Sequence, residues 1–250
     1  MNIESCLNAA IEASTKAGNK LKENFLAPHE LLADVGRDIK LSIDKEIEDE
    51  IKQHLEGFGF NFLGEETGFN SNQESKYFWV VDPLDGTANY FRNIPICANS
   101  IALMDLELNV HIAVVNDFLN DKLYFATKGN GAFCNNNPLK VSDIQQKVKA
   151  ILMTGIPSKK TYLDSEFEEL INSFQEWKKV RMIGSAAIAG AWIAEGLADC
   201  YNEKGIFIWD IASTMLLVKE AGGMANITSP TPEMRVNARF FNGCIESIDC

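Results

Sequence analysis

The sequence predicts a mixed α/β protein built from two closely packed halves, residues 1–145 and 146–250. Its 250 residues are enough for one large domain or two smaller ones, and 46% of them are hydrophobic. In the first half, two helical patterns precede a run of strand patterns. In the second half, strand and helix patterns alternate. Because no repeat and no Pro- or Ser-rich linker interrupts the chain, we expect one compact unit.

The first half begins with apolar residues at helical spacing over 3–25, which predicts a helix with one buried face. Ile47, Ile51 and Leu55 then recur every fourth residue and predict a second helix that begins just after Asp44. After this helix the period changes to that of strands. Strands are expected at 60–63, 77–81, 100–104, 110–115, 123–126 and 132–134.

The second half alternates between the two periods, as in a sheet covered by helices. Strands are expected at 150–153, 198–201 and 224–227, and helices at 165–177, 186–195 and 210–220. In the last helix Asp210 is expected to be the N-cap, and Gly222-Gly223 closes the helix.

The charge balance is acidic, with 23 Lys and Arg against 35 Asp and Glu and a formal net charge of −12. Such a surface repels phosphate backbones and anionic lipids, so we expect neither nucleic acid nor membrane as a partner. No signal peptide and no apolar stretch of membrane-spanning length is visible. The six cysteines show no metal-type spacing and are expected to be reduced thiols of a cytoplasmic protein.

The most specific segment is Asp82-Pro83-Leu84-Asp85-Gly86-Thr87, directly after the strand expected at 77–81. Two carboxylates at the carboxyl end of a strand lie where open sheets bind ligands. Gly86 allows a sharp turn, and a helix starting at Thr87 would present N–H groups to an anion. Taken alone, the segment is equally consistent with an acidic surface turn.

Two more carboxylate groups follow the same pattern. Glu65 and Glu66 come after Gly64 at the end of a predicted strand, and Asp210 follows Trp209 at a predicted helix start. Each has a plain explanation, a solvated loop for the first and an ordinary N-cap for the second. Together the three groups offer oxygen ligands without a His or Cys motif, and oxygen ligands select Mg²⁺, Mn²⁺ or Ca²⁺.

These segments resemble the inositol monophosphatase family, within the larger group that includes the fructose-1,6-bisphosphatases. The resemblance covers nearly the whole chain and rests on Gly64-Glu65-Glu66, Trp79–Tyr90, Gly184–Ala187 and Trp209–Ala212, in the family's order. It implies an αβαβα layered sandwich of the sugar-phosphatase type. It also implies a phosphomonoesterase that depends on Mg²⁺, with Mn²⁺ as an alternative cofactor, and that is often homodimeric and inhibited by lithium.

The resemblance also implies roles for individual residues. The metal ligands would be Glu65, Asp82, Asp85, Asp210 and the main-chain carbonyl of Leu84. The catalytic set would be Glu65 with Thr87 and Asp44, the last two orienting the attacking water. The substrate-binding set would be Leu84, Asp85, Gly86, Thr87, Gly184, Ser185, Glu203 and Asp210, with Gly86 and Thr87 cradling the phosphate and Glu203 binding a hydroxyl of the alcohol.

Segment 38–44 departs from the family's pattern. Asp38 and Asp44 keep their spacing, but Lys40-Leu41 replaces the usual Val-Thr, and Ala33 stands where the family has a lysine. Arg37 or Lys40 would then supply the missing positive charge near a third, weaker metal position; a solvated loop is the alternative. The departure leaves the third metal site open and does not affect the two-metal core.

The predicted function is hydrolysis of a small polyol or sugar phosphate, such as inositol 1-phosphate, by metal-activated water. Histidinol phosphate, fructose 1,6-bisphosphate and 3′-phosphoadenosine 5′-phosphate are alternative substrates on the same fold. The nucleotide-type relatives favour Gly-Ser-Ser-Leu-Lys where this chain has Gly184–Ile188, which argues against that branch. A non-catalytic cation- or phosphate-binding regulator is the third possibility. Loss of a key site residue would have signalled it, and Glu65, Asp82, Asp85, Thr87 and Asp210 are all present.

Overall fold

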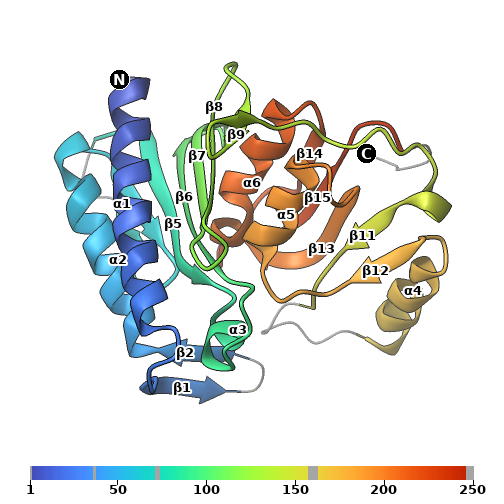
Figure 1. Cartoon of the computed structure of the whole chain (residues 1–250), viewed down its shortest axis with the longest axis horizontal. Coiled ribbons are helices and arrows are strands. Elements are labelled where there is room, and N and C mark those ends of the chain that lie inside the picture. The colour runs from blue at the N-terminus through green and yellow to red at the C-terminus, as the bar shows by residue number, and fades with distance from the viewer. Residues whose placement is uncertain (1, 36–37, 71–73, 157–162, 246–250) are drawn as a thin grey trace.

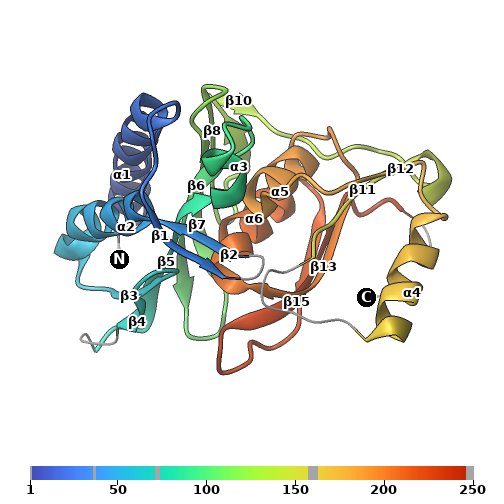
Figure 2. The ribbon, with the colours of Figure 1, turned by 90° about the horizontal axis from the view of Figure 1, so that it is seen from below.

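In the computed structural model the elements form five layers in the order helix, sheet, helix, sheet, helix (Figures 1 and 2). The structure describes residues 2–35, 38–70, 74–156 and 163–245. Helices α1 (Ile3–Asn24) and α2 (Ser42–Leu55) form the first layer. Helices α5 (Ala186–Ala194) and α6 (Ile208–Glu220) lie between the two sheets, and α4 (Asp164–Phe174) covers the far side of the second. The expected αβαβα sandwich is confirmed.

The first sheet has the strand order β10-β9-β8-β7-β6-β5-β3-β4. Its strands are β3 (Asn61–Gly64), β4 (Gly68–Asn70), β5 (Tyr77–Asp85), β6 (Ala98–Asp105), β7 (Val110–Asp117), β8 (Lys122–Thr127), β9 (Ala132–Cys134) and β10 (Asn137–Pro138). Most neighbours are antiparallel, but β3 and β5 run parallel. This one parallel pairing among the described strands of the sheet brings two carboxylate-bearing strand ends to the same edge.

The second sheet has the order β12-β11-β13-β15-β14. Its strands are β11 (Ile151–Met153), β12 (Lys179–Arg181), β13 (Cys200–Phe207), β14 (Met224–Ile227) and β15 (Arg235–Phe241). Strand β13 pairs parallel with β11 and antiparallel with β15. A separate hairpin, β1 (Leu31–Val35) with β2 (Asp38–Leu41), and the short helices α3 (Thr87–Phe91), η1 (Glu56–Phe58) and η2 (Lys147–Lys149) complete the elements.

The hydrophobic core lies between the layers, because each helix or strand buries the face on which its apolar residues recur. Helix α1 buries Cys6, Ala10, Ala13, Ala17 and Leu21 on one stripe. Strand β5 is buried on both faces from Phe78 onward, as its sequence predicted. Helix α5 consists largely of alanine and other small residues and is buried almost all round, which lets it pack closely between the sheets. Each fully buried large apolar side chain stabilises the fold by about 1.5–3 kcal/mol.

Several predicted boundaries are wrong for identifiable reasons. Helix α2 begins at Ser42, not after Asp44, because the Asp44 carboxylate accepts the N–H of Leu41 at 2.8 Å from inside the first turn. Asp210 is likewise the third residue of α6, not its N-cap, and accepts the N–H of Phe207 at 3.2 Å. Each carboxylate stands at the third residue of its helix and accepts the N–H of the residue just before the helix, which would otherwise lack a partner within the helix.

Other predicted elements have different bounds in the structure, and several strands were missed. Strand β5 continues through the Asp82–Asp85 segment expected to be a turn, with an irregular register against β6 there. Strand β13 starts at Cys200 and runs on to Phe207, and α4 ends at Phe174. Strands β1, β2, β4, β10, β12 and β15 were not predicted.

Two expectations about the chain as a whole can be compared with the described residues. The cysteines described, Cys6, Cys97, Cys134, Cys200 and Cys244, are all free thiols. Among the helices in the described part of the chain, none combines the length and apolarity that a bilayer crossing requires.

Candidate active site

The site begins at the end of β3, where this strand lies beside β5. Their parallel register pairs Gly64 with Val81, so the next residues, Glu65 just after β3 and Asp82 within β5, lie side by side. The N–H of Glu65 donates to the carbonyl of Val81 at 3.2 Å, which holds the two segments together just below the carboxylates. Glu65 therefore follows the end of β3 as predicted, whereas Asp82 lies inside β5, which continues to Asp85.

Helix α6 and strand β13 bring further carboxylates to this edge. Burial, followed by the charges of Glu65, Asp85 and Asp210, raises the pKa of Asp82 well above its usual value. The pKa of Asp210 is also raised well above its usual value, by burial first and then by Glu65, Asp85 and Glu203. Glu65, Asp82, Asp85, Glu203 and Asp210 are therefore electrostatic neighbours, although they come from four segments of the chain.

Four carboxylates of this cluster lack an ion-pair partner among the described residues. In the described residues, no Lys or Arg forms an ion pair with Asp82, Asp85, Glu203 or Asp210, although the first three are buried. Buried carboxylates without a counter-charge are costly, and divalent cations are the usual compensation when all donors are oxygens. The donor set therefore fits Mg²⁺ or Mn²⁺.

The side chains are not already gathered around one point. Within the ranges described, no three His, Cys, Asp or Glu side chains stand in an arrangement that could hold a metal ion. Protein donors engage the ligands instead: one oxygen of Asp82 accepts the N–H of Leu84 at 3.0 Å, and both oxygens of Asp85 accept hydrogen bonds. The chemistry of the donors fits a cation, and these hydrogen bonds fix how the carboxylates of Asp82 and Asp85 are oriented.

Asp85 binds the N-terminus of α5. The hydroxyl of Ser185 and the N–H of Ala187, the latter at 2.7 Å, donate to one oxygen, and the N–H of Ala186 donates to the other at 3.3 Å. Burial raises the pKa of Asp85 to about 6, although these three donors oppose the rise. Ser185, which with Gly184 is predicted to line the substrate pocket, thus contacts the strand that carries the predicted metal ligands.

The turn after β5 is shaped by Gly86 and Thr87. Gly86 has φ +90°, and a Cβ there would lie 2.9 Å from the carbonyl oxygen of Ile96, so only glycine fits. The hydroxyl of Thr87 donates to the carbonyl of Leu84 at 2.9 Å. The carbonyl predicted to bind metal and the hydroxyl predicted to orient water are therefore in contact. That Gly86 and Thr87 cradle a phosphate stays a prediction.

Asp44 reaches this region from α2. Burial chiefly, with the charges of Cys97 and Asp44 adding to it, raises the pKa of Tyr90. Tyr90 belongs to α3, the short helix that begins at Thr87, so Asp44 lies within electrostatic range of that helix. Its pairing with Thr87 around a water stays a prediction.

The departures in segment 38–44 have a structural counterpart. The ammonium of Lys40 contacts both carboxylate oxygens of Glu66 at 2.6 and 2.7 Å. The charge of Lys40 therefore lies at the turn between β3 and β4. That it serves a third metal position stays a prediction. Arg37 lies outside the described residues, and Ala33 lies on β1.

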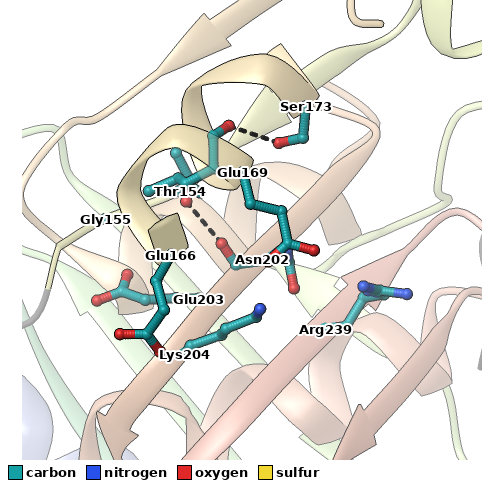
Figure 3. A pocket seen from close by; sticks show the side chains of 10 residues that line it. Thr154, Gly155, Glu166, Glu169, Ser173, Asn202, Glu203, Lys204 and Arg239 are labelled. Atoms are coloured by element: carbon teal, nitrogen blue, oxygen red, sulfur yellow. Dashed lines mark hydrogen bonds between the residues drawn. The ribbon is translucent and has the colours of Figure 1, made fainter. Parts of the chain in front are cut away.

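Glu203 faces a cavity of about 180 Å³ between α4 and the second sheet. Figure 3 shows Glu203 and Lys204 on β13 and Arg239 on β15, with Glu169 above them on α4. The hydroxyl of Tyr201 donates to Glu203 at 2.7 Å, and burial, reinforced by Asp85, raises the pKa of Glu203 to about 7. The sequence did not single out Lys204, Arg239 or the α4 glutamates.

A second residue missed by the sequence interpretation is Glu48. It is completely buried, and its carboxylate accepts the N–H groups of Glu66 and Thr67. Burial raises the pKa of Glu48, and the hydrogen bonds from Glu66 and Thr67 oppose this rise. Its position was a signal: Glu48 lies three and seven residues before the buried Ile51 and Leu55, and therefore on the same helical face.

Known proteins resemble this chain over nearly its whole length. The profile of the Inositol monophosphatase family matches residues 2–240. An inositol-1-monophosphatase of Mesorhizobium japonicum is 35% identical over 95% of this chain and 91% of its own length. The Nus factor SuhB of Escherichia coli K12 is 34% identical over 88% of this chain and 84% of its own. The inositol monophosphatase structure from Anabaena sp. PCC 7120 is 31% identical, with a TM-score of 0.82 over 98% of this chain and 93% of its own. The chain belongs to the inositol monophosphatase family.

Proposed function

We propose that the protein is a Mg²⁺-dependent phosphomonoesterase that releases phosphate from a small polyol or sugar phosphate resembling inositol 1-phosphate. One observation carries the proposal: burial, together with the charges of Glu65 and Asp85, raises the pKa values of both Asp82 and Asp210 well above their usual range. Membership of a family of metal-dependent phosphatases supports it. The identity of the cation and of the alcohol is part of the proposal.

The cations would be held by the side chains of Glu65, Asp82, Asp85 and Asp210 and by the carbonyl of Leu84. When bound, they would neutralise the phosphate, activate a water and stabilise the leaving alkoxide. Thr87 and Asp44 would orient the water from the side of α3. No side chain in this set needs to act as a nucleophile, so water attacks phosphorus directly.

The alcohol would lie between Asp85 and the cavity at Glu203. An ionised Glu203 accepts hydrogen bonds from substrate hydroxyls, and its pKa of about 7 leaves a substantial ionised fraction at neutral pH. The N-terminus of α5, at Gly184 and Ser185, would form the opposite wall of this part of the site. A hydroxyl-rich alcohol fits a wall of acceptors better than an apolar one.

A phosphate-release screen tests the proposed substrate class. The purified protein would be assayed with Mg²⁺ and inositol 1-phosphate, sugar phosphates, fructose 1,6-bisphosphate, histidinol phosphate and 3′-phosphoadenosine 5′-phosphate. We expect the highest kcat/KM for a polyol or sugar monophosphate. A preference of more than tenfold for histidinol phosphate or for the nucleotide would contradict the proposed class.

Some relatives carry the name Nus factor SuhB, which makes a binding role the second candidate. With a net charge of −12, such a role would be served better by a protein partner than by direct contact with nucleic acid. A role of this kind would survive Asp85→Asn, whereas the phosphatase role would not. A homodimer and inhibition by lithium are further proposals, which light scattering and a lithium titration of the activity would test.

A further inference from the structure

The turn that carries Glu65 is held from beneath by one buried side chain. One oxygen of Glu48 accepts the N–H of Glu66 at 2.8 Å, and the other accepts the N–H of Thr67 at 2.9 Å. Glu48 itself is 0% exposed and lies on the second turn of α2. A carboxylate that bonds two successive N–H groups restricts both the position and the orientation of the turn.

Gly64 and Glu48 are matched in shape. A Cβ at Gly64 would lie 2.4 Å from the carboxyl carbon of Glu48, a distance that heavy atoms do not reach without displacement. Gly64 is not among the residues with positive φ, so the reason for glycine is space and not backbone conformation. The Gly-Glu-Glu motif therefore begins with glycine because the carboxylate of Glu48 occupies the place of a side chain.

The backbone and the side chains of this turn contact different partners. Glu48 binds its backbone, Lys40 pairs with the side chain of Glu66, and the charge of Glu65 acts on Asp82 and Asp210. Placing a carboxylate in the interior is unfavourable unless strong donors meet it, so a structure that needs only stability is better served by an apolar residue there. The buried position of Glu48 is therefore explained by its hydrogen bonds to the backbone of Glu66 and Thr67.

We propose that Glu48 is a positioning residue: by binding the N–H groups of Glu66 and Thr67 it presents the carboxylate of Glu65 to the cation site. The inference rests on the proposed function, since it assigns Glu65 to that site. Outer-shell partners of metal ligands typically change metal affinity by about 10–100-fold when they are mutated.

The experiment measures cation binding and not catalysis. Chelator-stripped full-length protein is titrated with Mn²⁺ and followed by calorimetry and by the paramagnetic resonance of free Mn²⁺. Glu48→Gln places an NH₂ group against one N–H donor, and Glu48→Asp keeps the charge but withdraws the carboxylate. We expect both to raise the Kd of the tightest site by about tenfold or more. If Glu48→Gln does not fold, Glu48→Asp carries the measurement.

Glu220→Gln is the matched control. Glu220 likewise accepts two backbone N–H groups of a turn, those of Gly129 at 2.8 Å and Gly131 at 2.9 Å. It is the last residue of α6, whereas Asp210 is in the first turn, so about 15 Å of helix separates them. This variant should lose some stability and keep the Kd of the wild type.

A double-mutant cycle shows whether Glu48 acts through Glu65. In a Glu65→Gln background, Glu48→Gln should change the Kd less than twofold further, because the ligand it positions is already gone. Independent, additive losses would overturn the proposal, as would wild-type affinity in both Glu48 variants. If the wild type itself binds no Mn²⁺ or Mg²⁺, the cation site of the proposed function fails and the role of Glu48 fails with it.

Discussion

The carboxylate of Asp85 accepts a hydrogen bond from the hydroxyl of Ser185, a residue that follows it by 100 positions. Ser185 is also the N-cap of α5, since its oxygen accepts the N–H of Ile188 at 3.2 Å. One carboxylate thus joins the strand that carries the proposed metal ligands to the helix that would line the alcohol site. A change at Asp85 should therefore affect both binding functions and the contact between the two halves.

Asp85→Asn should lower kcat for phosphate release by about 100-fold or more, because even outer-shell changes at metal sites cost 10–100-fold. It should also lower the free energy of unfolding by about 1–3 kcal/mol, since an amide NH₂ would face N–H donors of α5. Steady-state kinetics and urea unfolding measure the two effects. Asp143→Asn, at an exposed position, is the control. Turnover within twofold of the wild type would remove Asp85 from the site.

Glu203→Gln should raise KM for a polyol phosphate by about tenfold while changing KM for an aryl phosphate without hydroxyls much less. The reason is that only the polyol donates hydrogen bonds to this carboxylate. Glu169→Gln, on the opposite wall of the same cavity, serves as the comparison. Equal effects on both substrates would assign Glu203 to the support of the fold.

The metal-free protein should become less stable as the pH rises from about 4 to 7. Burial raises the pKa of Asp85 to about 6 and that of Glu203 to about 7, whereas unfolded Asp and Glu titrate near 4. The folded state therefore holds more protons in this window. The resulting stability is present below about pH 4 and is lost as the pH rises through 6 and 7.

Added Mg²⁺ should reverse this trend, because a cation favours the ionised carboxylates and stabilises the folded state more at pH 8 than at pH 5.5. Thermal unfolding at both pH values, with chelator and with Mg²⁺, measures the difference. Glu203→Gln should remove the part of the slope near pH 7. A metal-free protein that gains stability towards pH 8 would show that these carboxylates are not coupled as described.

Hydrolysis should invert the configuration at phosphorus. Direct attack by water is a single in-line displacement, whereas a phospho-enzyme requires two displacements and retains configuration. The Asp82-to-Asp85 spacing of three, with Pro83 between, differs from the Asp-x-Asp of enzymes that form an aspartyl phosphate. A chiral, isotopically labelled phosphate ester distinguishes the two courses, and net retention or a phosphoaspartate at Asp82 would exclude direct attack.

The sequence predicted the elements whose apolar period is strong and missed those whose neighbours determine them. Helix α1, with one stripe of buried residues, and β5, with no polar face, were predicted because local pattern and burial agree. The hairpin β1–β2 has no such period. Strand β15 alternates buried Val236, Ala238 and Phe240 with more exposed residues, a signal that was present but was not used.

The site shows the same division. Asp82, Asp85 and Glu65 were singled out because their motifs follow predicted strands, but the contact between Asp85 and α5 joins residues that local patterns do not relate. In the sequence Glu48 is one of several acidic residues of α2. Its role becomes visible only in the structure, where the turn between β3 and β4 donates two N–H groups to it. Long-range hydrogen bonds of this kind follow from the packing of the layers, which the periodicity of single segments does not specify.

Phosphate release from inositol 1-phosphate by chelator-stripped protein, measured with and without Mg²⁺, tests whether the carboxylates act through a bound cation. We expect no detectable turnover with excess chelator, full recovery when Mg²⁺ is restored, and no recovery in Asp85→Asn at the same Mg²⁺ concentration. Turnover that persists undiminished in excess chelator would contradict the claim that the carboxylates of β3, β5 and α6 act through a bound cation.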